Sequence, residues 1–158
     1  MGKLKNDFYQ REDVVAIGKD LLGKYLFTNI NDQVTAGIIT ETEAYAGIND
    51  KASHAYNNCR TKRTEIMFAN GGVSYVYLCY GIHHLFNIVT NKKNIPHAIL
   101  IRAIKPVKGI TTILERRKQD TIHPKIAGGP GTVSQGLGIQ TIHSGIDLTV
   151  NIQSDLSL

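Results

Sequence analysis

The chain has 158 residues, of which 42% are hydrophobic and 20% are charged, and its formal net charge is +5. This length is typical of one domain, and the composition is that of a folded chain rather than a disordered one. No apolar run approaches the roughly 20 residues that a membrane helix needs, and residues 1–7 contain no apolar core of a secretory signal. We therefore expect a cytoplasmic protein, associated with the nucleoid if it is bacterial, whose mild positive charge permits a polyanionic partner.

The sequence carries no signature of a cofactor. Cys59 and Cys79 are too few for a disulfide framework or for a cysteine-based zinc site. A phosphate-binding GxxxxGK[ST] loop and a GxGxxG fingerprint are both absent, and none of the six histidines has the spacing of a metal motif. We predict that the protein uses neither a cofactor nor a metal.

The elements predicted in the first half begin with a helix over residues 13–22, for which Asp13 is a plausible N-cap. Two strands follow, over residues 25–30 and 34–45. The polar stretch over residues 46–64 is long for a connection in a compact domain, and such loops are often functional.

The second half is predicted to contain strands over residues 73–80, 85–90 and 98–104, a helix over 107–118, a short helix after Gly128-Gly129-Pro130-Gly131, and a last strand over 148–152. Strands with helices around them indicate an α+β fold. We expect one domain over residues 1–158, with a curved, mainly antiparallel, barrel-like sheet surrounded by short helices and with a protruding β-hairpin.

The segment TETEAY places two acids and a phenol on one face of a strand. Because side chains alternate along a strand, Glu41, Glu43 and Tyr45 point the same way. Such a face suits general acid–base chemistry. It also suits the solvated side of an edge strand, where glutamate is usually found.

The segment YVYLCYG is rich in tyrosine. Tyr75 and Tyr77 share a face and are able to stack on a base or to form ordinary cross-strand pairs. Tyr80 stands beside Gly81 at the expected tip of the hairpin. An aromatic side chain there has little core to fill, so Tyr80 is a candidate wedge into a base stack.

Three further side chains are unusual where they stand. Arg102 interrupts an apolar strand, so it must form an ion pair with a glutamate or face a polar cleft, where its partner would be Glu43. Asn87 lies inside a strand, where asparagine is depleted, and we expect it to have a specific hydrogen-bonding role. His54 lies in the long polar loop, either as a solvated surface group or as part of a site.

Basic residues and glycines are also spread along the chain. Backbone N–H groups of the Gly-Gly-Pro-Gly turn are able to bind a phosphate. Each cation alone is a typical solvated group, whereas together they could outline a phosphate-binding surface. These cations are Arg60, Lys62, Arg63, Lys92, Lys93, Arg116, Arg117 and Lys118.

Taken in order, TETEAY, a loop histidine, YVYLCYGIHHLFN, ILIRA and GGPGT…GLGI resemble the alkyladenine (3-methyladenine) DNA glycosylase family over about Asp13 to Asp147. The resemblance implies a monomer that acts on double-stranded DNA in base excision repair, without a membrane. It would rotate an alkylated or deaminated purine nucleotide out of the duplex and hydrolyse its N-glycosidic bond. The product would be an abasic site, with no lyase step, because no lysine stands at the catalytic position.

The resemblance also implies roles for individual residues. Glu43 would be the general base that activates a water, and Arg102 would help to hold that water and the carboxylate. Tyr45 and His54 on one side and Tyr77 on the other would enclose the extruded base.

Four further positions take their roles from the same resemblance. Asn87 would lie at the pocket floor and crowd the 2-amino group of guanine. Tyr80 would intercalate into the duplex, and Ile82, where some members have methionine, would enter the minor groove. Thr132 stands where the family commonly has a lysine, which removes one expected phosphate contact.

The chain ends at Leu158, earlier than family members do, so we expect it to lack their C-terminal closing segment. Two other functions stay open on the residues. One is a non-catalytic module that binds damaged DNA, weakened by this truncation. The other is a metal-dependent nuclease that uses Glu41, Glu43 and His54.

Overall fold

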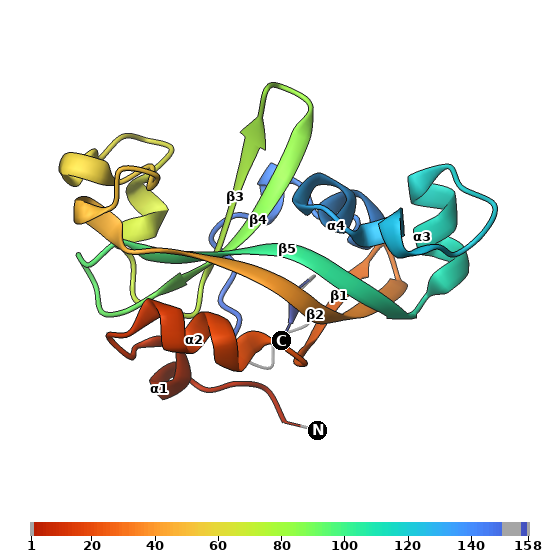
Figure 1. Ribbon diagram of the computed structural model, residues 1–158, viewed down its shortest axis with the longest axis horizontal. Coiled ribbons are helices and arrows are strands. Elements are labelled where there is room, and N and C mark those ends of the chain that lie inside the picture. Colours follow the sequence, from red (N-terminus) through yellow and green to blue (C-terminus); the bar gives the residue numbers. More distant parts are fainter. Residues whose placement is uncertain (1, 150–155, 158) are drawn as a thin grey trace.

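An antiparallel sheet carries the site residues. The computed structural model describes residues 2–149 and 156–157, and in this part of the chain every neighbouring pair of strands runs antiparallel. The strands are β1 (Tyr25–Ile30), β2 (Gln33–Tyr45), β3 (Ser74–Cys79), β4 (His83–Thr90), β5 (His97–Lys108) and β6 (Leu156–Ser157), in the spatial order β3-β4-β5-β2-β1-β6. The sheet is curved like half of a barrel (Figure 1).

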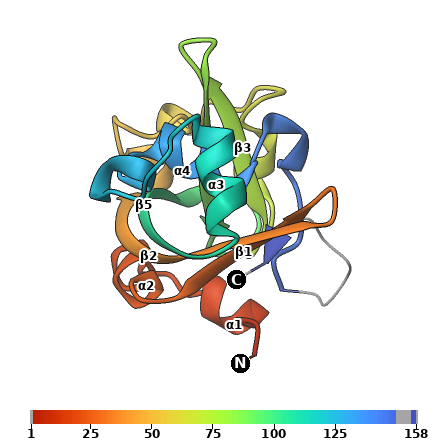
Figure 2. The same cartoon turned by 90° about the vertical axis from the view of Figure 1, so that its right-hand side faces the viewer.

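Short helices cover both faces of this sheet. Helices α1 (Asn6–Tyr9) and α2 (Val14–Leu21) lie below it in Figure 1, and α3 (Ile110–Arg117) and α4 (Pro130–Leu137) lie above it. Figure 2 shows the β3–β4 hairpin rising on the same side as α4. No helix in the described part of the chain is long and apolar enough to cross a membrane. The predicted α+β fold with a protruding hairpin is confirmed.

Two hydrophobic clusters hold the fold together. The larger cluster joins α2, α3 and α4 to the sheet and includes Ile17, Phe86 and Ile101. The smaller cluster lies under the long β2–β3 loop, where Met67 and Phe68 pack against the strands. Burial of such side chains stabilises a fold by about 1.5–3 kcal/mol each. The smaller cluster therefore fixes a loop that is otherwise polar.

Most of the predicted elements are confirmed. The helix predicted over 13–22 is α2, and the Asp13 carboxylate accepts a hydrogen bond of 2.9 Å from the Ala16 N–H as its N-cap. The loop over 46–64 contains the 3₁₀ turns η1 (Gly47–Asn49) and η2 (Tyr56–Asn58), and η3 (Glu65–Phe68) follows directly.

The start of one helix, the end of the strand before it and the first part of the last strand were predicted wrongly. The helix expected over 107–118 begins only at Ile110, because Val107 and Lys108 continue β5 and Gly109 turns the chain with a φ of +67°. Lys108 still pairs with Ala36 on β2. Leu148 and Thr149 form no strand, and the rest of the strand predicted over 148–152 lies outside the described residues.

Candidate catalytic and base-binding site

Arg102 reaches the functional face because the pairing of β5 with β2 is irregular there. Glu41 pairs with Ala103 and Thr42 with Ile101, so Arg102 is an extra residue on β5, and a compensating shift lies just before Glu41 on β2. Such β-bulges re-aim side chains and are frequent beside active sites. The bulge explains how an arginine in an apolar strand avoids the core.

The Glu43 carboxylate is held by two donors. The Arg102 guanidinium donates a hydrogen bond of 2.7 Å to Oε1, and the Tyr45 hydroxyl donates one of 2.5 Å to Oε2. Each carboxylate oxygen has two lone pairs, so both oxygens still have room for a water. The Glu43 side chain is 38% exposed, which keeps that position accessible.

Arg102 stands between two glutamates. Besides its contact with Glu43, its Nε lies 3.7 Å from a carboxylate oxygen of Glu41. From the sequence, Arg102 had two interpretations, a structural ion pair or a site arginine that faces Glu43. The structure places it against both acids, with the hydrogen bond going to Glu43.

Tyr45 links the carboxylate to a pocket beside it. Its ring lines the pocket while its hydroxyl bonds to Glu43. Burial raises the pKa of Tyr45, and the hydrogen bond to the Glu43 carboxylate raises that pKa further. The phenol therefore stays protonated and remains a donor to Glu43.

The pocket is narrow, with a cavity volume of about 40 Å³, well below the range of sites that hold a small molecule. Aromatic and small side chains from β2, β3, β4, β5 and the long loop surround it. The residues that line it are Tyr45, Ala52, Ser53, His54, Met67, Tyr75, Tyr77, Asn87 and Ala98. The four positions expected from the resemblance to face a base, Tyr45, His54, Tyr77 and Asn87, are thus brought together.

His54 and Tyr77 touch each other directly. Their ring centroids are 4.5 Å apart with an interplanar angle of 70°, an edge-to-face contact. A base that stacks between two parallel rings needs about 7 Å between the planes of those rings, twice the spacing of stacked bases. The described state therefore has no parallel slot between these two rings.

Tyr75 fixes the orientation of His54. Its hydroxyl lies 2.9 Å from Nδ1 of His54, and its ring lies 5.4 Å from that of Tyr77. The sequence left two interpretations of Tyr75 open, a ring that stacks on a base or an ordinary cross-strand pair, and the resemblance assigned it no role. Met67 also lines the pocket, and no sequence pattern pointed to it.

The pocket walls are uncharged at neutral pH. Burial lowers the pKa of His54, and the nearby charge of Arg63 lowers it further. Burial raises the pKa of Tyr75 to about 12 and also raises the pKa of Tyr77. The imidazole is therefore neutral and the phenols are protonated under physiological conditions.

Asn87 is fixed by the strand around it. Its side chain is 3% exposed, and its amide nitrogen donates to the carbonyl oxygens of Tyr75 and Leu85, both at 3.3 Å. These bonds account for the hydrogen-bonding role expected of an asparagine inside a strand. The side-chain carbonyl oxygen of Asn87 accepts no hydrogen bond from any residue that the structure describes.

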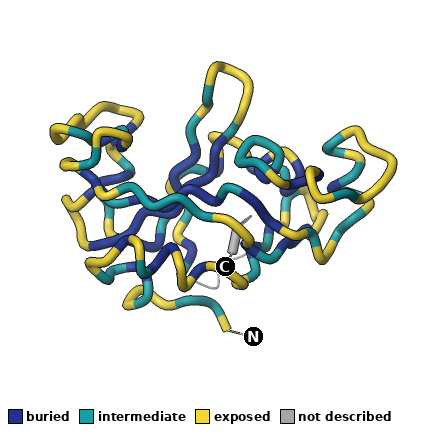
Figure 3. The backbone as a smooth tube through the Cα atoms, in the orientation of Figure 1, coloured by how far each residue is buried: buried dark blue, intermediate teal, exposed yellow. Residues whose placement is uncertain are grey.

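The tip of the β3–β4 hairpin is fully exposed. Tyr80 is 92% exposed and Ile82 is 72% exposed, and Figure 3 shows the tip standing clear of the buried sheet. Tyr80 has a φ of +51° and Gly81 a φ of +68°, as in a type I′ turn. A non-glycine residue in this region is strained, and such strain clusters at functional sites.

Thr132 is used to cap its own helix. Its hydroxyl accepts a hydrogen bond of 3.0 Å from the Gly129 N–H and donates one of 2.8 Å to the Gly129 carbonyl. Gly131 lies so close to His83 that a Cβ there would be 3.0 Å from the imidazole. The start of α4 is therefore packed against the first residue of β4, close to the turn of the hairpin.

The three residues considered for a metal-dependent nuclease do not gather. Glu41 and Glu43 face Arg102, and His54 faces Tyr75 and Tyr77. In residues 2–149 and 156–157, no group of three or more His, Cys, Asp or Glu side chains could hold a metal ion.

Comparison with known proteins agrees with this geometry. The family described as methylpurine-DNA glycosylase matches residues 7–158. A relative from Chlamydia felis is 46% identical over 147 residues, which are 92% of this chain and 76% of the relative. One from Chlamydia pneumoniae is 47% identical over 137 residues, 86% of this chain and 70% of the relative. One from Natranaerobius thermophilus is 43% identical over 150 residues, 94% of this chain and 75% of the relative.

Each of these relatives carries the provisional name 3-methyladenine DNA glycosylase. A curved sheet with a glutamate beside an aromatic pocket fits the class of DNA glycosylases, hydrolases that act on DNA. The chain belongs to the methylpurine-DNA glycosylase family. The resemblance drawn from the sequence motifs is thereby confirmed.

Proposed function

We propose that the protein, acting as a monomer, extrudes damaged purine nucleotides from duplex DNA and hydrolyses their N-glycosidic bond. The observation that carries this proposal is the Glu43 carboxylate, held by Arg102 and Tyr45 at the edge of an aromatic pocket. The product is an abasic site in an intact strand.

The surroundings of Glu43 suit the activation of a water. Glu43 and Arg102 line an open groove between β2 and α2, whereas Tyr45 lines the base pocket. A base in the pocket and a water from the groove would thus meet at the carboxylate. Glu43 takes a proton from the water while the oxygen of that water bonds to the sugar C1′. The C1′–N bond breaks, and its electron pair leaves with the purine.

The same carboxylate lowers the barrier electrostatically. Cleavage of a bond to a sugar develops oxocarbenium character on the ring, as in glycoside hydrolysis. A preorganised anion beside C1′ stabilises that positive charge more than it stabilises the ground state. Arg102 and Tyr45 fix the carboxylate before the reaction begins.

The neutral pocket walls favour a cationic purine. Aromatic faces attract cations, with a contribution of about 0.5–2 kcal/mol. An imidazolium at His54 would repel such a base, and the lowered pKa of His54 prevents this at neutral pH. Purines that carry a positive charge after alkylation also leave readily, so recognition and reactivity select the same bases.

Admission of a base requires His54 and Tyr77 to separate. Their edge-to-face contact occupies the space that a stacked purine needs. Stacking of the base contributes about 1–3 kcal/mol, which offsets the loss of one aromatic contact of about 0.5–1.5 kcal/mol. We infer that the pocket opens as the base enters it.

The hairpin tip would support extrusion by acting on the duplex from which the nucleotide is removed. Tyr80 would fill the gap that the extruded nucleotide leaves, and Ile82 would contact the minor groove. Apolar wedges of this kind unstack base steps at a cost of a few kcal/mol. Extrusion costs least for a damaged or mispaired base, which adds to selectivity.

The experiment that tests this function is analysis of the products from duplex DNA that contains hypoxanthine or 3-methyladenine. We expect free base and an alkali-labile abasic site, with the strand intact before alkali treatment. Tight binding without release of a base would favour the alternative of a non-catalytic damage-binding module. Strand cleavage that a chelator abolishes would contradict the proposal and favour a nuclease.

A further inference from the structure

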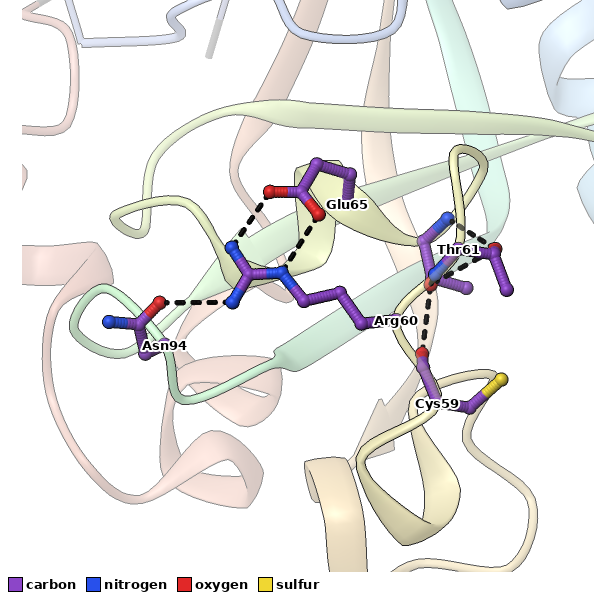
Figure 4. A network of polar contacts seen from close by, with 6 residues as sticks. Cys59, Arg60, Thr61, Glu65 and Asn94 are labelled. Carbon is purple, nitrogen blue, oxygen red and sulfur yellow. Dashed lines mark hydrogen bonds and ion pairs between the residues drawn. The ribbon is translucent and has the colours of Figure 1, made fainter.

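The long β2–β3 loop carries three cations that differ in their partners. Arg60 is fully engaged: its guanidinium donates two hydrogen bonds of 2.8 and 2.7 Å to the Glu65 carboxylate, and another of 3.4 Å to Asn94 (Figure 4). Its guanidinium carbon also lies 4.6 Å from the centre of the Phe68 ring. Arg60 therefore has a structural role, because it joins Glu65, Asn94 and Phe68 within the protein.

Directly after Arg60, a tight turn is fixed by two threonines. The buried Thr64 hydroxyl donates to the Cys59 carbonyl at 2.8 Å and accepts from the Thr61 N–H at 2.8 Å. The Glu65 N–H bonds to the Thr61 carbonyl at 2.8 Å. Every one of these bonds is internal to the loop, so the turn is preorganised.

Lys62 and Arg63 occupy the middle of this turn. Both are exposed, and neither makes a hydrogen bond or an ion pair with any residue that the structure describes. The nearest acid in sequence, Glu65, is committed to Arg60. The turn therefore presents two adjacent positive charges that no described carboxylate neutralises.

The turn lies beside the pocket. The same loop supplies Ala52, Ser53, His54 and Met67 to the pocket lining. The charge of Arg63 lowers the pKa of His54 and opposes the rise that burial causes in the pKa of Tyr75 and Tyr77. Arg63 therefore lies within electrostatic range of His54, Tyr75 and Tyr77.

We propose that the Lys62–Arg63 turn binds the backbone phosphate next to the extruded nucleotide, with Arg63 as the principal anchor; this rests on the proposed function. A nucleotide that enters the pocket brings its flanking phosphates to the pocket mouth. A guanidinium is able to bind a phosphate through two parallel hydrogen bonds. Because Arg63 has no described partner to give up and the turn is rigid, this contact needs little reorganisation. This phosphate contact positions the DNA strand and does not depend on the identity of any base.

The test compares Arg63→Gln with Lys5→Gln, which removes the same charge from an exposed residue just before α1, on the opposite side of the sheet (Figure 1). Affinity for a duplex with a stable abasic-site analogue is measured over a series of salt concentrations. Loss of one phosphate contact reduces the slope of log K against log salt by about 0.9. We expect that loss for Arg63→Gln, no change for Lys5→Gln, and recovery of the slope in Arg63→Lys.

Thermal unfolding serves as the folding control. Because Arg63 has no described partner, Arg63→Gln should keep the melting temperature of the wild type, whereas Arg60→Gln should lower it. A wild-type slope for Arg63→Gln, or an equal fall for Lys5→Gln, would overturn the proposal. Base release by the wild type is scored separately. Its absence together with a reduced slope would refute the glycosylase function and leave the phosphate site standing.

Discussion

Replacement of Tyr80 by asparagine is predicted to stabilise the protein. Tyr80 is 92% exposed, so its side chain buries almost no surface that the substitution could lose. Its φ of +51° lies in the left-handed region, which costs an ordinary residue about 1–2 kcal/mol. Asparagine tolerates this region well. Relief of about 1 kcal/mol would raise the melting temperature by about 2–4 °C in a chain of this size.

The same substitution is predicted to impair excision. Asparagine cannot stack in the gap that an extruded base leaves, and such stacking contributes about 1–3 kcal/mol. The efficiency of excision from duplex DNA should therefore fall about 5- to 150-fold. On single-stranded DNA, where no gap has to be filled, the loss should be much smaller.

The assay combines thermal unfolding by circular dichroism with single-turnover excision of hypoxanthine. Ile142→Asn is the matched control: Ile142 is 81% exposed but has no positive φ, so it offers no strain to relieve. Its melting temperature should stay unchanged. A lower melting temperature for Tyr80→Asn together with undiminished excision would refute both parts of the reasoning.

Three further predictions concern the carboxylate, the pocket floor and pH. Tyr45→Phe removes a hydrogen bond to Glu43 and should slow excision about 10- to 150-fold, since bonds to charged groups contribute about 1.5–3 kcal/mol; a wild-type rate would contradict this role. Asn87→Ala should increase the release of guanine from undamaged duplex, measured as free base, and unchanged release would show that Asn87 does not exclude guanine. Burial lowers the pKa of His97 in the folded state, so the unfolded chain binds protons more readily. The free energy of unfolding should be constant above about pH 6.5 and fall at lower pH. Urea titrations should show a weaker fall for His97→Asn, and an equal fall would exclude His97 as a cause.

The alternation of side chains along strands was enough to predict much of the site. It placed Glu43 with Tyr45 and Tyr75 with Tyr77, because both pairs are separated by two residues and need only local geometry. The hairpin tip was predicted from Gly81, because a glycine between two strand patterns marks a turn. These features depend on contacts that are close in the sequence.

Features that depend on distant contacts could not be predicted in this way. The bulge that turns Arg102 toward Glu43 is set by the register of β5 against β2. The position of His54 depends on its loop, which Met67 and Phe68 anchor in the smaller hydrophobic cluster. The late start of α3 depends on the pairing of Lys108 with Ala36, which extends β5 past its apolar core.

The central claim is that Glu43 is the general base of a hydrolytic glycosylase. The most direct measurement is the single-turnover rate of hypoxanthine release from duplex DNA by the wild type and by Glu43→Gln, both at saturating protein. The account predicts a fall of about 10²- to 10⁴-fold, with an unchanged affinity for duplex that contains an abasic-site analogue. Equal rates of release by the two proteins would contradict it.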